Sequence, residues 1–180
     1  MASQNNSGSG DLRAAPAGTK PTPTAKPIVV ERLTHLDIPE ICGLYKRVWE
    51  PMRSVLPGEL VKAWTPGPLE FTSSMEGVTY FAARRDGRLI GAIGCELGEG
   101  SCRLIQIAVD TDQRRQGVAT ALTTAAIEWA RHNNSPSVWA DALVKFETAA
   151  HLFKRLGFAE CGTFHRHLFG EDVRIFELIL

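Results

Sequence analysis

An excess of one charge is missing from this sequence, and so are long apolar runs. The 20 basic and 20 acidic residues cancel, so the formal net charge is zero. A neutral chain shows no sign of the electrostatic attraction that binds nucleic acid or an anionic membrane surface. No stretch approaches the ~20 apolar residues of a membrane-spanning helix. We therefore expect a protein whose partners include neither nucleic acid nor a membrane.

Cysteine is also sparse, with four residues at Cys42, Cys95, Cys102 and Cys161. They lie far apart and form no C-x-x-C pair, which excludes a standard zinc site. A chain of 180 residues can bury a core of its own, so a disulfide framework is not expected either. We expect reduced, mostly buried thiols and no bound metal, as suits a cytoplasmic protein.

The first 27 residues have almost nothing to bury. They hold four of the ten prolines, three glycines, one leucine and no aromatic residue. Such a composition cannot offset the entropy of ordering the chain, and it lacks the apolar centre of a secretory signal. We predict a disordered N-terminal tail over residues 1–27 and one folded domain over residues 28–180.

Apolar patterning predicts strands and helices along this domain. Short apolar runs bounded by turn residues indicate strands, and apolar residues spaced three and four apart indicate helices. The expected elements are strands at 27–33, 78–97 (a hairpin), 102–110 and 137–144, helices at 37–50, 118–131 and 147–158, short helical turns within 51–71, and a last hairpin around Gly170. The order β-α-α-β-β-β-α-β-α-β-β gives an α/β fold of the α+β type. Its central sheet is mixed and mostly antiparallel, with helices on both faces.

The string "QRRQGVAT" at residues 113–120 precedes a predicted helix. The first turn of a helix has unpaired N–H groups and about half a positive charge. It binds phosphate when the preceding loop has small side chains. Arg114 adds a cation, Gly117 has no Cβ, Ala119 is small and Thr120 carries a hydroxyl. Together these residues indicate an anion site.

An ordinary helix start is the alternative for this string. Thr111 or Asp112 would then cap the helix, and the two arginines would be solvated. The string contains neither GxxxxGK[ST] nor GxGxxG, so it is not a nucleotide fingerprint. By itself it leaves both interpretations open.

The context of the string resembles the GCN5-related N-acetyltransferase (GNAT) superfamily. Residues 114–119 match its R/Q-x-x-G-x-G/A motif, and "AAHLFKRLGF" (149–158) looks like its A-x-x-L-Y-x-x-x-G-F motif. The resemblance covers residues 28–180 and implies acetyl-CoA as co-substrate. The pyrophosphate would lie on the N–H groups of residues 115–120, and the pantetheine arm would pair with the strand before them. The implied cofactor-binding residues are Ile107, Ala108, Val109, Arg114, Arg115, Gln116, Gly117, Val118, Ala119, Thr120 and Phe153.

Acyl transfer from a thioester to an amine needs a base for the amine and a donor for the developing oxyanion. The resemblance implies a backbone N–H as that donor, from Val109 or Ala108. Asp141 is the first candidate base, because it shares a strand face with Trp139 and Leu143. A carboxylate in such apolar company is a typical general base. Its position also matches a catalytic glutamate of ribosomal-protein N-terminal acetyltransferases.

Other assignments of the base remain open. Glu96, on the strand before residues 102–110, is the second candidate. A purely structural hydrogen bond or ion pair is the alternative for Asp141. Ordered water can also remove the proton of the amine.

The acid of the reaction is missing from its usual place. The superfamily often has a tyrosine on the last helix to protonate the leaving sulfur, and the matching residue here is Phe153. Phe146 stands where an asparagine is common. Phenylalanine has no proton to donate, and core packing alone would explain Phe153. The thiolate then leaves unassisted or with help from water or another residue, or the protein binds acyl-CoA without fast turnover.

The resemblance implies an acceptor site near residues 49–71, and the aromatic side chains there suit a pocket wall or lid. The same residues would also suit packing of helices on the sheet. His165 and His167 are two residues apart on a strand, so both side chains are expected to point to one face. Either histidine could act as a base or bind an acidic substrate. The alternative is that both lie on an exposed strand face. The apolar last strand would suit a homodimer.

The predicted function is acetyl-CoA-dependent N-acetyltransferase acting on a primary amine of a small molecule or peptide. The alternative is a catalytically weak acyl-CoA sensor of the same fold.

Overall fold

The computed structural model of the chain describes residues 26–98 and 100–180. Most of the tail predicted over residues 1–27 therefore lies outside the described residues. Within the described ranges, the chain forms both strands and α-helices. Their bounds are β1 Val29–Arg32, α1 Ile38–Trp49, α2 Gly58–Trp64, α3 Pro68–Ser74, β2 Val78–Arg85, β3 Arg88–Leu97, β4 Cys102–Val109, α4 Val118–His132, β5 Ser137–Leu143, α5 Glu147–Arg155, β6 Ala159–Leu168 and β7 Glu171–Ile179.

The predicted order of elements is confirmed, with one correction between β1 and β2. The sequence predicts two helices there, and the structure has three. Proline and glycine cause the extra break. Helix α2 ends at Trp64, and α3 begins at Pro68 after Gly67, with proline in the first-turn position that it favours.

The strands form one sheet in the order β1-β2-β3-β4-β5-β7-β6. Strands β4 and β5 run parallel, and the other neighbours run antiparallel. The predicted mixed, mostly antiparallel sheet is therefore confirmed. Parallel neighbours need a crossover, and α4 supplies it, so the loop over residues 110–117 lies at the end of β4.

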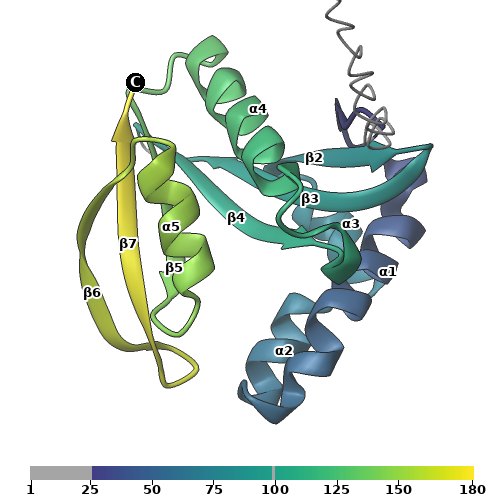
Figure 1. Cartoon of the computed structure of the whole chain (residues 1–180), viewed down its shortest axis with the longest axis horizontal. Coiled ribbons are helices and arrows are strands. Elements are labelled where there is room, and N and C mark those ends of the chain that lie inside the picture. Colours follow the sequence, from purple (N-terminus) through teal and green to yellow (C-terminus); the bar gives the residue numbers. More distant parts are fainter. Residues whose placement is uncertain (1–25, 99) are drawn as a thin grey trace, which may run out of the picture.

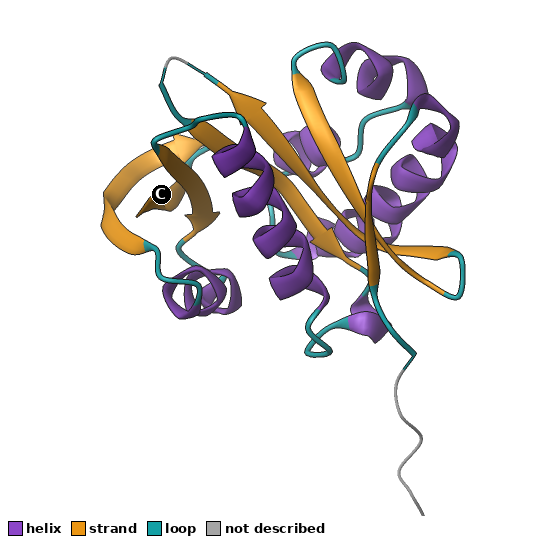
Figure 2. Cartoon of the chain, turned by 90° about the horizontal axis from the view of Figure 1, so that it is seen from above, coloured by secondary structure: helices purple, strands orange, loops and turns teal. Residues whose placement is uncertain are grey.

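Helices cover both faces of the sheet (Figures 1 and 2). Helices α4 and α5 pack on one face, around Leu122 and Phe176. Helices α1 and α3 pack on the other face, around Tyr45. Helix α2 contacts the far half of the sheet at Leu143 and Val173. The clusters on the two faces fix the positions of α1 and α4 on either side of β4.

The sheet opens between β4 and β5. These strands pair over three positions, Cys102 to Leu104 with Val138 to Ala140, and then diverge (Figure 1). A bulge in β4 lies beside the opening. The register with β3 runs from Ile105 opposite Gly94 to Ala108 opposite Ala92, so β4 carries one extra residue there. The backbone of β4 beyond Leu104 therefore lacks β5 as a partner.

Gly91 of β3 allows α4 to lie close to the sheet. A Cβ at this position would stand 2.9 Å from the Cγ1 atom of Val118 and 3.1 Å from the Cδ1 atom of Leu122. We expect Gly91→Ala to lower the free energy of unfolding by about 1–3 kcal/mol, the usual cost of overpacking. Gly77→Ala is the matched control, because no described atom lies within 4 Å of its Cβ position. Equal urea midpoints for the two variants would contradict the expectation.

Candidate active site

Backbone groups of Ile107 and Val109 face the opening between β4 and β5. Asp110 donates its N–H to the Ile90 carbonyl of β3 at 2.9 Å, and backbone groups alternate sides along a strand. The N–H groups of Ile107 and Val109 therefore point away from β3. The Ala108 carbonyl points toward β3, where its oxygen lies 3.1 Å from the position that a Cβ on Gly91 would take. Of the two predicted oxyanion donors, Val109 has the required direction, and Ile107 is a further one.

The loop between β4 and α4 has the backbone of an anion site. Helix α4 begins at Val118, with Gly117 left-handed at the N-cap (φ +84°), and Arg115 is also left-handed (φ +60°). Within the described chain, no side chain caps this helix and no acidic residue stands in its first turn. The N–H groups of Val118, Ala119 and Thr120 therefore remain available at the positive end of the helix.

The caps expected for an ordinary helix start, Thr111 or Asp112, are wrong, whereas the two arginines are exposed as that alternative expects. Thr111 and Asp112 belong to a separate 3-10 turn, Thr111–Gln113, which ends before α4 begins. The Asp112 carbonyl accepts a hydrogen bond from Gln116 Nε2 at 2.9 Å. Arg85 of β2 donates to Gln113 Oε1 at 2.7 Å and also to Gln116 Oε1. These bonds fix the loop to itself and to β2, and none of them caps the start of α4.

Three guanidinium groups surround the start of α4. The Arg114 and Arg115 side chains are exposed, and Arg114 Nε donates to the Val109 carbonyl at 3.3 Å. Arg155 reaches over from α5 and donates to Thr120 Oγ1 at 3.2 Å. Arginine beside free backbone N–H groups is typical of phosphate recognition.

A buried carboxylate fixes the beginning of this loop. Asp110 is 3% exposed, and it accepts two hydrogen bonds from Arg47 of α1, both at 3.0 Å. Arg88 of β3 adds a third at 2.7 Å. A buried charge that is paired and hydrogen-bonded in this way is satisfied. The loop therefore leaves β4 from a position held by two other elements.

Asp141 stands where the opening begins. The last pair of β4 and β5 joins Leu104 to Ala140, so Asp141 is the first residue of β5 beyond it. Alternate residues of β5 pack on opposite faces. Ala140 belongs to the α4 cluster and Leu143 to the α2 cluster. The prediction that Asp141 shares a face with Trp139 and Leu143 is therefore confirmed.

The expected apolar surroundings of Asp141 are wrong. Arg103 of β4 donates to the Asp141 carboxylate at 2.9 Å, and the Asp141 side chain is 21% exposed. The Arg103 guanidinium also lies over the Trp139 ring, 4.8 Å from its centroid. The carboxylate is thus part of an ion pair on the face of α1 and α2. A catalytic role for Asp141 stays a prediction.

Glu96, the second candidate base, lies one strand away. It pairs directly with Arg103 across β3 and β4, so the two side chains share a face. Glu96 is half-buried and stands level with the paired segment of β4, whereas Asp141 stands beyond it. The position at the opening therefore favours Asp141, and the role of Glu96 stays a prediction.

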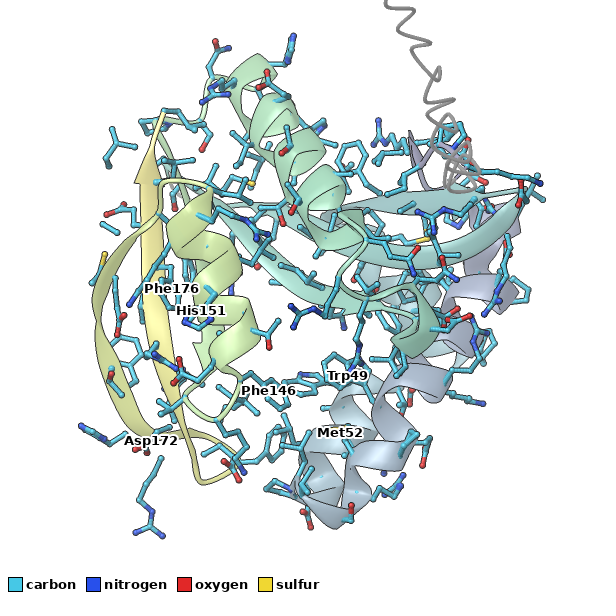
Figure 3. The ribbon with its side chains drawn as sticks, in the orientation of Figure 1. Trp49, Met52, Phe146, His151, Asp172 and Phe176 are labelled. Atoms are coloured by element: carbon cyan, nitrogen blue, oxygen red, sulfur yellow. The ribbon has the colours of Figure 1, made fainter. Side chains whose placement is uncertain are left out.

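Phe153 is a core residue in this structure. It is 2% exposed, and its ring centroid lies 5.3 Å from those of Phe158 and Phe176. Figure 3 shows Phe176 behind α5. A ring enclosed in this way presents little surface to a ligand, so the contact with a cofactor that the resemblance implies stays a prediction.

Aromatic side chains bridge the two halves of the sheet on the α1 and α2 side. The Trp49 ring lies 4.6 Å from Trp64 and 6.3 Å from Phe146, between centroids. Figure 3 shows Trp49 and Phe146 side by side, with Met52 on the neighbouring turn. These side chains pack the helices on the sheet, as one interpretation of residues 49–71 expects. Their part in an acceptor pocket stays a prediction.

His165 and His167 lie on an irregular part of β6. Arg166 between them is left-handed (φ +52°), and the register with β7 shifts after Phe164. The alternation that would put both rings on one face is therefore interrupted. His165 Nδ1 lies 3.1 Å from a carboxylate oxygen of Asp172, which Figure 3 labels. Both histidines are exposed and away from the opening.

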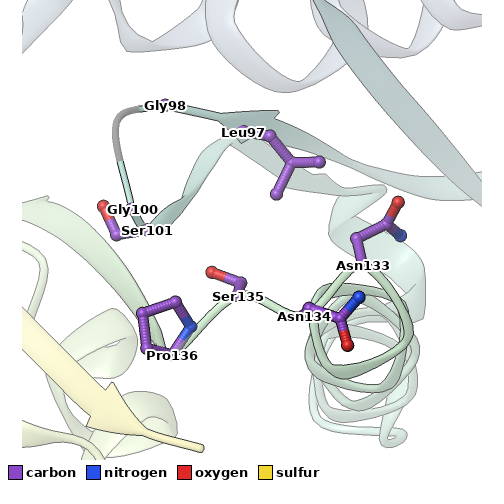
Figure 4. Close-up of a pocket in the computed structure, with 8 residues that line it drawn as sticks. All are labelled: Leu97, Gly98, Gly100, Ser101, Asn133, Asn134, Ser135 and Pro136. Atoms are coloured by element: carbon purple, nitrogen blue, oxygen red, sulfur yellow. The ribbon is translucent and has the colours of Figure 1, made fainter.

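Two hollows of the described surface lie away from the opening. One, of about 250 Å³, lies between the β3–β4 turn and the end of α4 (Figure 4), at the opposite end of β4 from the phosphate loop. The other, of about 520 Å³, is lined by Glu59, Lys62, Ala63, Thr65, Pro66, Glu70 and Phe169. Neither includes a residue predicted for the cofactor.

The described ranges hold neither a cluster of metal ligands nor a helix that could span a membrane. Over residues 26–98 and 100–180, no three His, Cys, Asp or Glu side chains gather as metal ligands would. In the same part of the chain, no helix combines the length and the apolarity of a membrane span. Cys42, Cys95 and Cys102 are buried free thiols, as predicted, and Cys161 is exposed.

Sequence reasoning missed several residues of the site, among them Arg103, Arg155, Gln106 and Tyr80. Arg103 and Arg155 carry no local signal, because their partners come from other elements. Gln106 did offer a signal, since it is a polar residue inside the apolar run "CRLIQIAV". Tyr80 donates to it from β2. A polar side chain in a central strand often marks a bulge or a buried hydrogen bond.

Comparisons with known proteins agree with this geometry. The model of the acetyltransferase (GNAT) family matches residues 39–158. N-acetyltransferase 8B of Mus musculus is 24% identical over 108 residues, covering 57% of this chain and 47% of that protein. The structure of ribosomal-protein-alanine N-acetyltransferase from Brucella melitensis has a TM-score of 0.65 at 21% identity, covering 84% and 99% of the two chains. PaiA N-acetyltransferase from Thermoplasma acidophilum, solved in complex with coenzyme A, has a TM-score of 0.69 at 12% identity, covering 83% and 98%.

These matches differ in what they show. The structural neighbours share the fold at low sequence identity, and the chain spans about half the length of the curated relative that it matches. The family model covers residues 39–158, which are two thirds of the 180 residues. The loop of residues 110–117 and the opening between β4 and β5 both fall inside it. The chain therefore belongs to the acetyltransferase (GNAT) family.

Proposed function

We propose that this protein transfers the acetyl group of acetyl-CoA to a primary amine of a small molecule or peptide. One observation carries the proposal. The uncapped start of α4 and the open edge of β4 are continuous with one another. Coenzyme A has matching parts in the same order, a pyrophosphate followed by an extended amide-bearing arm and a thiol.

The residues present fit coenzyme A. No described atom lies within 4 Å of the Cβ position of Gly117, so a phosphate can approach the backbone there. Arg114 and Arg115 are exposed beside it. An amide-bearing arm can add to the edge of β4 as a further strand would, using the N–H groups of Ile107 and Val109. The neighbour from Thermoplasma acidophilum that holds coenzyme A supports this assignment.

The chain supplies groups for both halves of the chemistry. Acetyl-CoA, when bound, brings a thioester carbonyl that an amine can attack. The N–H of Val109 or Ile107 would stabilise negative charge on its oxygen. Asp141 lies across the opening on the α1 and α2 side, where it can accept the proton of an amine directly or through water.

A second function, an acyl-CoA sensor with slow turnover, is favoured by Phe153. A phenylalanine side chain has no ionisable group, so the residue at the usual acid position cannot protonate a leaving thiolate, and its ring is buried besides. A thiolate is a good leaving group, and its unassisted departure remains compatible with catalysis. The acyl-CoA site is common to both functions, and turnover with an amine distinguishes them.

Thiol release from acetyl-CoA, measured across a panel of amines, tests the proposal. The panel includes small primary amines, peptides with free N-termini, and N-blocked peptides with one lysine. We expect a rate that saturates with at least one amine. Coenzyme A binding without any saturable rate would support the sensor, and absence of binding would refute both functions.

A further inference from the structure

We propose that Tyr45 and Tyr80 are positioning residues that hold the β4 bulge at Gln106 and so select the backbone N–H groups that face the opening. This inference rests on the proposed function, because it concerns the edge of β4 assigned to the cofactor arm.

Both tyrosines of the chain bond to Gln106. The Tyr80 hydroxyl donates to Gln106 Oε1 at 2.6 Å, and the Tyr45 hydroxyl donates to the Gln106 main-chain carbonyl at 3.2 Å. They are the two tyrosines of the sequence, and Tyr45 is 0% exposed and Tyr80 1% exposed. Burial raises the pKa of each phenol, so both keep their protons and act as donors. Two buried aromatic residues from α1 and β2 thus converge on one residue of β4.

Gln106 has a backbone that needs such support. Its φ is +51°, in the left-handed region that residues with a Cβ seldom adopt. Strained residues of this kind persist where their surroundings over-determine them, and they gather at functional sites. A hydrogen bond to the side chain and another to the carbonyl fix Gln106 at two points. The bulge is therefore held by side chains on one face of the sheet.

The bulge decides which residues of β4 face which side. Ile105 lies on the face of Tyr80, since both approach the Cβ position of Gly94. Regular alternation would put Ile107 on that face too. Instead, Ile107 packs with the α4 cluster and Ala108 with the α1 cluster. A one-residue slip reverses every later residue, so loss of the bulge would turn the other set of amides toward the opening.

The test removes the Tyr80 hydroxyl and then relieves the backbone strain at Gln106. Tyr80→Phe keeps the ring against Phe71, whose centroid is 4.6 Å away, and removes the bond to Gln106. We expect a fall of about tenfold, equal to 1.4 kcal/mol, in coenzyme A affinity and in kcat/KM for acetyl-CoA. Gln106→Gly in the Tyr80→Phe background should recover most of the loss, because glycine adopts positive φ without strain.

Rescue is the result that a merely structural role would not give. Glycine inside a strand ordinarily weakens it, so recovery by Gln106→Gly points to backbone conformation. Ser74→Ala is the matched control. It removes the other hydroxyl near Tyr80, at 3.2 Å, and leaves the bond to Gln106, so affinity should not change. Unchanged affinity in Tyr80→Phe, or no recovery in the double variant, would overturn the inference. Should Tyr80→Phe fail to fold, Tyr45→Phe with the same rescue takes its place.

Hydrogen exchange separates this inference from the proposed function. The amide protons of Ile107 and Val109 report the state of the bulge without any ligand. We expect their exchange to change in Tyr80→Phe and to return toward the original rates in the double variant. A parent protein that binds no coenzyme A would refute the proposed function alone. Unaltered exchange in Tyr80→Phe would refute the positioning role alone.

Discussion

Replacing Gly117 by glutamate is expected to abolish the binding of coenzyme A and leave the protein folded. The new carboxylate would stand at the start of α4, where the helix favours an anion and the pyrophosphate would lie. The residue would also need a positive φ of 84°, which a side chain disfavours. A ligand at ~100 times its Kd stabilises a protein by about 2.7 kcal/mol. That shift should appear in the melting curve of the parent and vanish in the variant.

Gly170→Glu is the control for this experiment. Gly170 has the same φ of +84°, in the turn between β6 and β7. No described atom lies within 4 Å of its Cβ position, as at Gly117. The substitution thus imposes the same charge and the same backbone strain away from the loop. Retention of the ligand shift in Gly117→Glu, or its loss in Gly170→Glu as well, would argue against a pyrophosphate on residues 115–120.

Asp141→Asn is expected to lower kcat by about 10²–10⁴, the usual contribution of a general base. An amide keeps the shape of the side chain and cannot take the proton of the amine. The position of Asp141 beyond the last pair of β4 and β5 places it beside the opening and not in the phosphate loop. The affinity for coenzyme A should therefore stay within a few fold of the parent. Steady-state rates with the best amine and calorimetry with coenzyme A measure the two quantities.

Glu96→Gln distinguishes the two candidate bases. It makes the same exchange of oxygen for nitrogen on the same face of the sheet, next to Arg103. We expect it to reduce kcat much less than Asp141→Asn does. The reverse order would assign the base to Glu96. Small effects of both would leave proton removal to water and reduce Asp141 to its ion pair with Arg103.

Local patterns predicted much of this fold. The predicted hairpin over residues 78–97 depends on a few neighbouring residues, because its turn at Asp86 and Gly87 has positive φ at both (+54° and +76°). The turn before α4 was also within reach, because its glycine and arginines are adjacent in sequence. Where the residues of one short segment determine its backbone conformation, the sequence is enough to predict that conformation.

Features that depend on register were out of reach. Arg103 and Asp141 are 38 positions apart, and their contact follows from the parallel pairing of β4 with β5, which neither strand specifies alone. The start of α4 was uncertain for a similar reason. Thr111 and Asp112 are good caps by type, yet the 3-10 turn places them too early. The bulge at Gln106 needed knowledge of two tyrosines from α1 and β2.

The short ladder between β4 and β5 also bears on how the protein unfolds. Its three paired positions are fewer than at the other strand junctions of the described chain. Residues up to His132 build one side of this junction, and residues from Ser137 build the other. Two sequence-contiguous units joined so weakly by backbone can open separately, as cooperative subunits of folding do. A ligand arm lying between them would add the missing hydrogen bonds, so occupancy would merge two unfolding units into one cooperative transition.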